Sequence, residues 1–215
     1  MSLFIFFSVV FAAFLHALWN ALIKVGGSKV GGMLIMTLVQ GGIGLAFALT
    51  RPMPTGEVML WIAASGVLHA SYKLFLAFAY EQGDLSRVYP IARGAAPMIV
   101  IGVSALFLSD VIAPAGYAGV VMLGTGVAVM AKGAFLSGES RRLVPLALGS
   151  AMMTAGYSLV DGLGARLSGA AVMYVAWLFA LDALFFAPVC LAMRGRGVLR
   201  ANGGAWAWGG VAAAA

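Results

Sequence analysis

Histidine, asparagine and lysine side chains recur at regular spacing in the apolar N-terminal stretch of the chain. In FLHALWNALIKVGG, residues 14–27, the positions His16, Asn20 and Lys24 follow one another at four-residue intervals. Residues at this spacing share one face of a helix. An imidazole, an amide and an ammonium group in a bilayer must face protein or trapped water, so we expect this face to mark a binding site or a passage.

A second group of polar side chains lies further along, again within apolar sequence. His69, Tyr72 and Lys73 stand at positions i, i+3 and i+4, so they share one face of the expected helix. Arg93 lies shortly before Pro97, which removes a backbone hydrogen bond at mid-depth and kinks its helix. We expect Lys73 and Arg93 to lie in the same half of the bilayer, where their positive charges would add.

The pattern of the N-terminal stretch returns 138 positions later in MMTAGYSLVDGLGA, residues 152–165. There Tyr157 takes the place of Trp19, and Ser158 takes the place of Asn20. The sequence therefore indicates an internal duplication.

Two interpretations of the ionisable groups remain open. A charge at the bilayer centre costs about 2.5–3.5 kcal/mol on insertion scales, so Lys73 and Asp182 must be paired, hydrated or neutralised. In the first interpretation Asp182 pairs with Lys73 or Arg93 and only holds helices together. In the second, the cationic groups line a cavity for an anionic or zwitterionic solute, and Asp182 is a proton-coupling or gating group.

Several of the same side chains also have structural interpretations. Arg93 is close enough to the start of its helix to extend to the lipid headgroups. His16 and His69 could be hydrogen-bonded packing residues, because polar side chains routinely join membrane helices. Four aromatic side chains could fill space between helices or belong to an aromatic belt, namely Trp19, Tyr157, Tyr174 and Trp177.

The composition predicts an integral membrane protein. Of the 215 residues, 63% are hydrophobic and only 9% are charged, whereas about a quarter of a typical soluble domain is charged. The net charge of +6 comes from short basic loops and is poor evidence for a nucleic-acid partner. The sequence has no catalytic, metal-binding or phosphate-cradling motif, and Ser158 with Asp161 is an unconvincing basis for a lipid-modifying enzyme.

A spanning helix needs about 20 mostly apolar residues, and runs of this kind alternate with short polar breaks. The expected helices cover 2–24, 31–50, 58–80, 88–108, 115–132, 143–163 and 169–193, and an eighth begins near Ala205. The loops after every second helix, starting with the first, carry nine Lys and Arg residues, against two on the other side. The positive-inside rule would then place the N-terminus outside.

The duplication has a consequence for topology. If the repeat runs from the first helix to the sixth, each unit holds five helices, and an odd number forces the second copy to cross the membrane upside down. We therefore predict an all-α membrane protein with an inverted repeat of five-helix units, the ten-helix carrier fold. The first unit is 1–138, and the second, 139–215, is truncated after about two and a half helices. The repeat length predicts a parent protein of about 270–290 residues.

Three segments carry a resemblance to a known family. They are ALWN followed by Lys24, the stretch LAFAYEQGDLSRVYPIARGAAPMIV over residues 76–100, and the turn Ser109-Asp110 before a Gly-rich helix. Together they resemble EamA-type members of the drug/metabolite transporter superfamily, and GDLSRVYPIARG more narrowly resembles EamA-like proteins associated with phosphonate utilisation.

The resemblance implies a ten-helix secondary transporter whose central cavity is formed mainly by helices 1, 3, 4, 6, 8 and 9. It also implies that both termini lie in the cytoplasm, against the charge count. The chain departs from the family in having Ser109-Asp110 where an acidic Gly-Glu turn is usual, and in lacking the membrane glutamate of the small multidrug relatives.

We thus expect a multi-pass secondary transporter of the cell membrane that moves a small polar metabolite, anionic or zwitterionic, by alternating access. The alternative is a non-transporting scaffold or subunit whose polar residues serve helix packing. The expected partners are the solute and the lipid bilayer, with a homodimer as one possible assembly, no nucleic acid and no cofactor or metal. The expected solute contacts are His16, Trp19, Asn20, His69, Tyr72, Lys73, Arg93, Tyr157 and Ser158, with Asp182 as the coupling or gating group.

Overall fold

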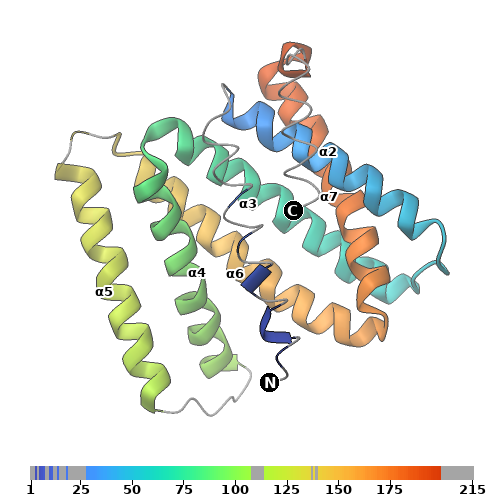
Figure 1. Cartoon of the computed structure of the whole chain (residues 1–215), viewed down its shortest axis with the longest axis horizontal. Coiled ribbons are helices and arrows are strands. Elements are labelled where there is room, and N and C mark those ends of the chain that lie inside the picture. Colours follow the sequence, from blue (N-terminus) through green and yellow to red (C-terminus); the bar gives the residue numbers. More distant parts are fainter. Residues whose placement is uncertain are drawn as a thin grey trace.

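The structure, a computed structural model, describes residues 28–107, 114–136, 138 and 140–199, together with scattered residues between 3 and 18. Within the continuous ranges the chain forms six long helices and one short 3-10 helix (Figure 1). They are α2 (Lys29–Ala48), α3 (Gly56–Gln82), α4 (Leu85–Phe107), α5 (Pro114–Leu136), α6 (Leu143–Ser168), α7 (Ala171–Arg194) and η1 (Arg196–Leu199).

Each of the six long helices is long and apolar enough to cross a membrane. The all-helical, multi-pass membrane architecture is thereby confirmed for this part of the chain. The six helices match the expected ranges with shifts of a few residues at their ends. The helix expected over 2–24 falls mostly outside the described residues, and the helix expected from Ala205 falls outside them entirely.

Local sequence signals explain where two of these helices begin. The Ser28 hydroxyl accepts a hydrogen bond from the Gly31 amide at 3.0 Å, and the Thr55 hydroxyl accepts one from the Val58 amide at 3.4 Å. Both residues have extended backbone and satisfy an amide that lacks a partner inside the helix. The caps place the first residues of α2 and α3 at Lys29 and Gly56.

Helices α2 and α7 lie side by side over most of their length (Figure 1). A Cβ added at Gly41 would lie 2.3 Å from that of Ala183, and one at Gly44 would lie 2.7 Å from the backbone oxygen of Ala176. The contacts move toward the start of α7 as they move toward the end of α2, so the helices are antiparallel. Small residues let the two backbones approach closely.

Helix α3 is central, because it packs against both α6 and α7, while α4 packs on α6 and α5 lies outside against α4. On α5 only Ala134 is buried. The contacts of α3 with α6 are again close: a Cβ at Gly149 would lie 2.8 Å from the Phe75 ring, and one at Gly164 would lie 2.9 Å from the Cβ of Trp61. This packing brings polar side chains of α3, α4, α6 and α7 together.

Candidate functional site

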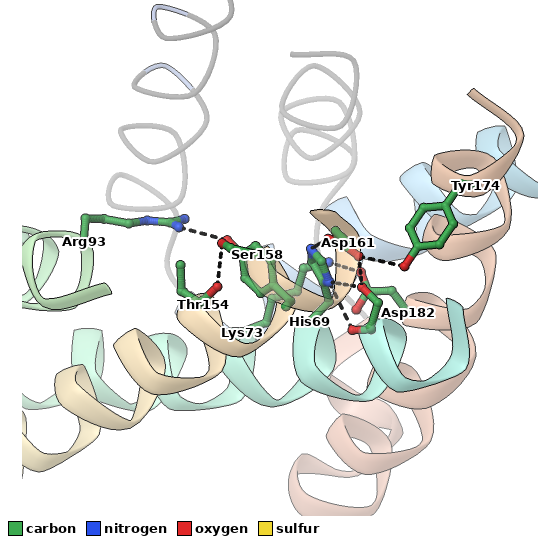
Figure 2. A network of polar contacts seen from close by, with 10 residues as sticks. His69, Lys73, Arg93, Thr154, Ser158, Asp161, Tyr174 and Asp182 are labelled. Atoms are coloured by element: carbon green, nitrogen blue, oxygen red, sulfur yellow. Dashed lines mark hydrogen bonds and ion pairs between the residues drawn. The ribbon is translucent and has the colours of Figure 1, made fainter. Parts of the chain in front are cut away.

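A row of polar side chains runs through the membrane region across four helices (Figure 2). Figure 2 shows Arg93 of α4 at one end, Tyr174 of α7 at the other, and His69 of α3 with Asp161 of α6 between them. The row divides into three parts with different chemistry: a buried ion pair, a carboxylate held by neutral groups, and a guanidinium among aromatic rings.

The buried ion pair joins Lys73 of α3 to Asp182 of α7, in direct contact. Their side chains are only 4% and 3% exposed. The Lys73 ammonium also donates a hydrogen bond to the Thr37 hydroxyl of α2 at 2.9 Å. Three helices thus meet at this pair, which is the pairing expected in the first interpretation of Asp182. The second carboxylate oxygen of Asp182, Oδ1, has no hydrogen-bond partner among the described residues.

The second part is centred on Asp161, whose carboxylate is surrounded by neutral or titratable groups. It accepts hydrogen bonds from the Ser65 hydroxyl and, at 3.1 Å, from the Tyr174 hydroxyl. The Nε2 atom of His69 lies 3.8 Å from its other oxygen. The Nδ1 atom of His69 lies 3.1 Å from the Ser65 backbone oxygen and 3.1 Å from the Ser65 hydroxyl. Ser65 therefore touches both ionisable groups.

The third part holds Arg93 among three tyrosine side chains. Its Nη1 donates a hydrogen bond to the Tyr157 hydroxyl at 3.3 Å. The guanidinium carbon lies 5.5 Å from the centre of the Tyr72 ring and 5.9 Å from that of Tyr89. Cations at such distances are attracted by the negative ring face. The Nε atom is buried without a hydrogen-bond partner, and no carboxylate of the described residues lies within ion-pair distance of Arg93.

Stacked rings connect the second part with the third. The His69 ring lies over the Tyr157 ring with a centroid distance of 3.9 Å and an interplanar angle of 26°. The Tyr72 ring stands 5.2 Å from Tyr157 and 5.8 Å from His69. The imidazole that faces Asp161 therefore contacts the same tyrosine whose hydroxyl binds Arg93.

Of the predicted contacts, the structure brings His69, Tyr72, Arg93 and Tyr157 together, while Lys73 is paired with Asp182. Ser158 is exposed, and its hydroxyl donates to the Thr154 backbone oxygen at 2.7 Å, so it stands outside this group. The predicted contacts His16, Trp19 and Asn20 lie outside the described residues.

Ser65 and Tyr174 belong to the cluster although neither was a predicted site residue. Ser65 lies four residues before His69 on α3, so the spacing rule that grouped His69 with Lys73 could have found it. Tyr174 meets Asp161 only because α6 turns back into α7 at Gly169, where φ is +60°. No spacing rule within one helix predicts that contact.

Two cavities lie at the ends of the helices, and neither is lined by a residue of this row. One, of about 600 Å³, is lined by the α2–α3 and α6–α7 loops, including Arg51, Pro54 and Ser168. The other, of about 220 Å³, is lined by Lys29, Tyr80 and residues 83–85. Neither contains a predicted solute contact.

The described part of the chain shows no group of three or more His, Cys, Asp or Glu side chains that could hold a metal ion. No family model, curated protein or solved structure matches the chain. The resemblance to EamA-type transporters therefore remains an expectation from sequence. Function has to be inferred from the residues in the membrane region.

Proposed function

We propose that the protein is a secondary transporter that binds a small anionic or zwitterionic solute at Arg93 and moves it by alternating access. The observation that carries the proposal is a half-buried guanidinium inside the membrane region that lacks a carboxylate partner among the described residues. Intramembrane cations normally pair with an anion or face water. A bound anionic group would complete the pairing.

The chemistry around Arg93 suits a planar or branched anion. A guanidinium presents several N–H donors in a fixed fork that matches carboxylate or phosphonate oxygens. One donor group binds Tyr157, and Nε has no acceptor in the described residues. The Thr154 hydroxyl, three positions before Tyr157 on α6, is likewise buried and finds no hydrogen-bond partner in the part of the chain that the structure describes. A solute with two or more oxygens could accept from both.

The helix arrangement supports an inverted repeat of the EamA type. An inverted repeat has a two-fold axis in the membrane plane, so equivalent helices beside that axis run antiparallel. With the 138-residue offset, α2 and α7 are equivalent, and they are antiparallel. The same offset makes Phe179 the equivalent of Gly41, and a Cβ at Gly41 would lie 3.2 Å from the Phe179 backbone oxygen. The proposed axis would pass through this contact, near the middle of both helices.

In this proposal the Lys73–Asp182 pair joins α2, α3 and α7 and does not contact solute. The pair is almost fully buried, and Lys73 donates a further hydrogen bond to the Thr37 hydroxyl. Two opposite charges in contact need no external counter-ion.

A scaffold without transport is the second candidate. The observation in its favour is that the Lys73–Asp182 pair is almost fully buried and that both cavities described above lie at the helix ends. In such a scaffold Arg93 would serve only packing against the tyrosine rings, and no small anion would bind.

Binding and uptake by the purified full-length protein would separate the two. We would screen carboxylates, amino acids and phosphonates by solute-dependent thermal stabilisation, and then measure uptake into proteoliposomes. We expect Arg93→Gln to weaken binding at least tenfold, because an Arg–carboxylate hydrogen-bonded pair typically contributes about 1.5–3 kcal/mol.

The matched control is Arg51→Gln. Arg51 also lies over a ring, 5.2 Å from the centre of Phe47, but it is exposed in a loop. We expect this variant to bind and transport as the wild type does. Unchanged binding by Arg93→Gln would contradict the anion site, and a folded wild-type protein that binds no member of the panel would favour the scaffold.

A further inference from the structure

The two aspartates of the membrane region differ in what balances their charge. Asp182 contacts the Lys73 ammonium and is buried. Asp161 has no Lys or Arg within ion-pair distance among the described residues, and its partners are the hydroxyls of Ser65 and Tyr174 and the imidazole of His69. A carboxylate without a permanent counter-charge in a membrane is the one whose charge can change by binding a proton.

The exposure of the side chains differs in the same direction. The side chains of Asp161 and His69 are 27% and 15% exposed, whereas those of Lys73 and Asp182 are 4% and 3% exposed. Asp161 and His69 are therefore less completely covered by protein than the buried pair. Protonation of Asp182 would instead leave Lys73 as a buried cation without an anionic partner.

The His69 imidazole is oriented so that it can bind a proton next to Asp161. In the tautomer whose Nδ1–H donates to the Ser65 backbone oxygen, Nε2 is the nitrogen that gains or loses a proton, and Nε2 faces Asp161. Without the extra proton, Asp161 and neutral His69 together carry one negative charge. Binding one proton on Nε2 or on the carboxylate brings the pair to net zero, which the low dielectric favours.

A contact path leads from this pair to the anion site. His69 stacks on Tyr157, and the Tyr157 hydroxyl accepts from Arg93. Removing one negative charge near Arg93 makes an added anion more favourable there. The other titratable or charged groups that surround His69 and Asp161 are Tyr72, Lys73, Arg93, Tyr157, Tyr174 and Asp182.

We propose that Asp161 and His69, bridged by Ser65, form a proton-binding site whose occupation favours anion binding at Arg93. Proton binding itself does not depend on the proposed function, but its coupling to an anion rests on that function. The site would make the protein a carrier that moves a proton and an anion together. By linkage, an anion that binds better to the protonated protein must also strengthen proton binding.

The first test measures protonation without any solute. Infrared difference spectra of the full-length protein in lipid, recorded between about pH 5 and 8, report the band of a protonated carboxyl group. We expect one band to disappear in Asp161→Asn, which preserves an acceptor for Ser65, and to shift in His69→Gln. Glu81→Gln is the control, because Glu81 is an exposed carboxylate paired with Arg194, and it should leave that band in place.

Other results would overturn the proton site. One is a band that persists in Asp161→Asn. Another is a band that vanishes only in Lys73→Met/Asp182→Leu, a double variant that replaces the buried pair with apolar side chains. A third is an Asp161 carboxylate signal that responds to Na⁺ at constant pH, which would indicate a metal cation as the ligand.

The second test measures coupling, with lactate as the probe because its carboxylate stays ionised over this pH range. In the wild type we expect lactate affinity to fall as the pH rises, by up to about tenfold per pH unit, because one coupled proton is lost. In Asp161→Asn we expect lactate affinity to be independent of pH. A protonation band that depends on Asp161, with pH-independent lactate binding in the wild type, would overturn the coupling. The same band with no lactate binding at any pH would retain the proton site and count against Arg93 as a carboxylate site.

Discussion

At the scale of single residues, the surroundings of a side chain decide what it can do here. Lys73 and Arg93 are both cations of the membrane region, and the sequence made both of them candidates for solute contact. Lys73 meets a carboxylate and a hydroxyl, whereas Arg93 meets tyrosine rings. The charge of Lys73 is balanced by the carboxylate of Asp182. The charge of Arg93 is not balanced by a described carboxylate, so Arg93 could bind an anion.

Removing one partner of the buried pair should destabilise the protein strongly. Asp182→Leu leaves the Lys73 ammonium buried with only the Thr37 hydroxyl, and losing one partner of a buried pair costs about 3–5 kcal/mol. The double variant Lys73→Met/Asp182→Leu removes both charges and should recover most of this loss. Thermal unfolding in detergent measures all three proteins. A double variant as unstable as the single one would show that the pair has a further structural role.

Sequence spacing predicted part of the site and could not predict the rest. The i, i+3 and i+4 rule grouped His69, Tyr72 and Lys73 correctly on α3. It could not show that Lys73 meets Asp182 across α7 while His69 meets Asp161 on α6, because that depends on which helices become neighbours. Contacts 92 and 109 residues apart in the chain leave no local signal.

At the scale of helices, the contact between α2 and α7 depends on glycine at particular positions. Gly44 faces α7, where a Cβ would lie 2.8 Å from the Cβ of Phe179 and closer still to the backbone of Ala176. Gly42, two positions earlier, has nothing within 4 Å of its would-be Cβ. Backbone atoms cannot move aside as a flexible side chain can.

This difference predicts opposite effects for the same substitution. We expect Gly44→Ala to lower the free energy of unfolding by about 1–3 kcal/mol, because overpacking forces the helices apart. Gly42→Ala should be neutral or stabilising by up to about 1 kcal/mol, since alanine has the higher helix propensity. Thermal unfolding of the two variants side by side is the measurement, and equal effects would argue against close α2–α7 packing.

Hydropathy was sufficient to place these helices but not to arrange them. The expected ranges agreed with the structure because apolar runs of membrane length are unmistakable, and the caps Ser28 and Thr55 account for the earlier starts of α2 and α3. Packing partners were not predictable, since helices that are apolar on every side show no preferred face. The glycines that mark the contacts resemble the glycines that contact nothing.

At the scale of the whole molecule, the helix ends separate the charges by side. The α2–α3 and α6–α7 loops line one cavity and so share a side, which carries Arg51 and Arg166. The opposite side carries most of the described basic residues, namely Lys29, Arg87, Lys132, Arg141, Arg142, Arg194 and Arg196. Charge asymmetry of this kind sets orientation in the membrane.

We therefore predict that the side with Arg51 is not cytoplasmic. The sole cysteine, Cys190, is buried, so Cys190→Ala gives a simple background for labelling. In intact cells, Met53→Cys should react with a thiol reagent that cannot cross membranes, whereas Ser86→Cys should react only after the cells are opened. Both positions are exposed. The reverse pattern would reverse the topology.

The Lys73–Asp182 pair also constrains how the protein is made. The two residues are 109 positions apart, so at about 5–20 residues per second a ribosome adds Asp182 roughly 5–20 s after Lys73. Throughout that interval the Lys73 ammonium lacks its carboxylate partner. Of its two hydrogen-bond partners in the folded protein, only Thr37 has already been synthesised. Helix α3 would then complete its insertion late, and a ribosome that stalls before α7 would leave a chain exposed to membrane quality control.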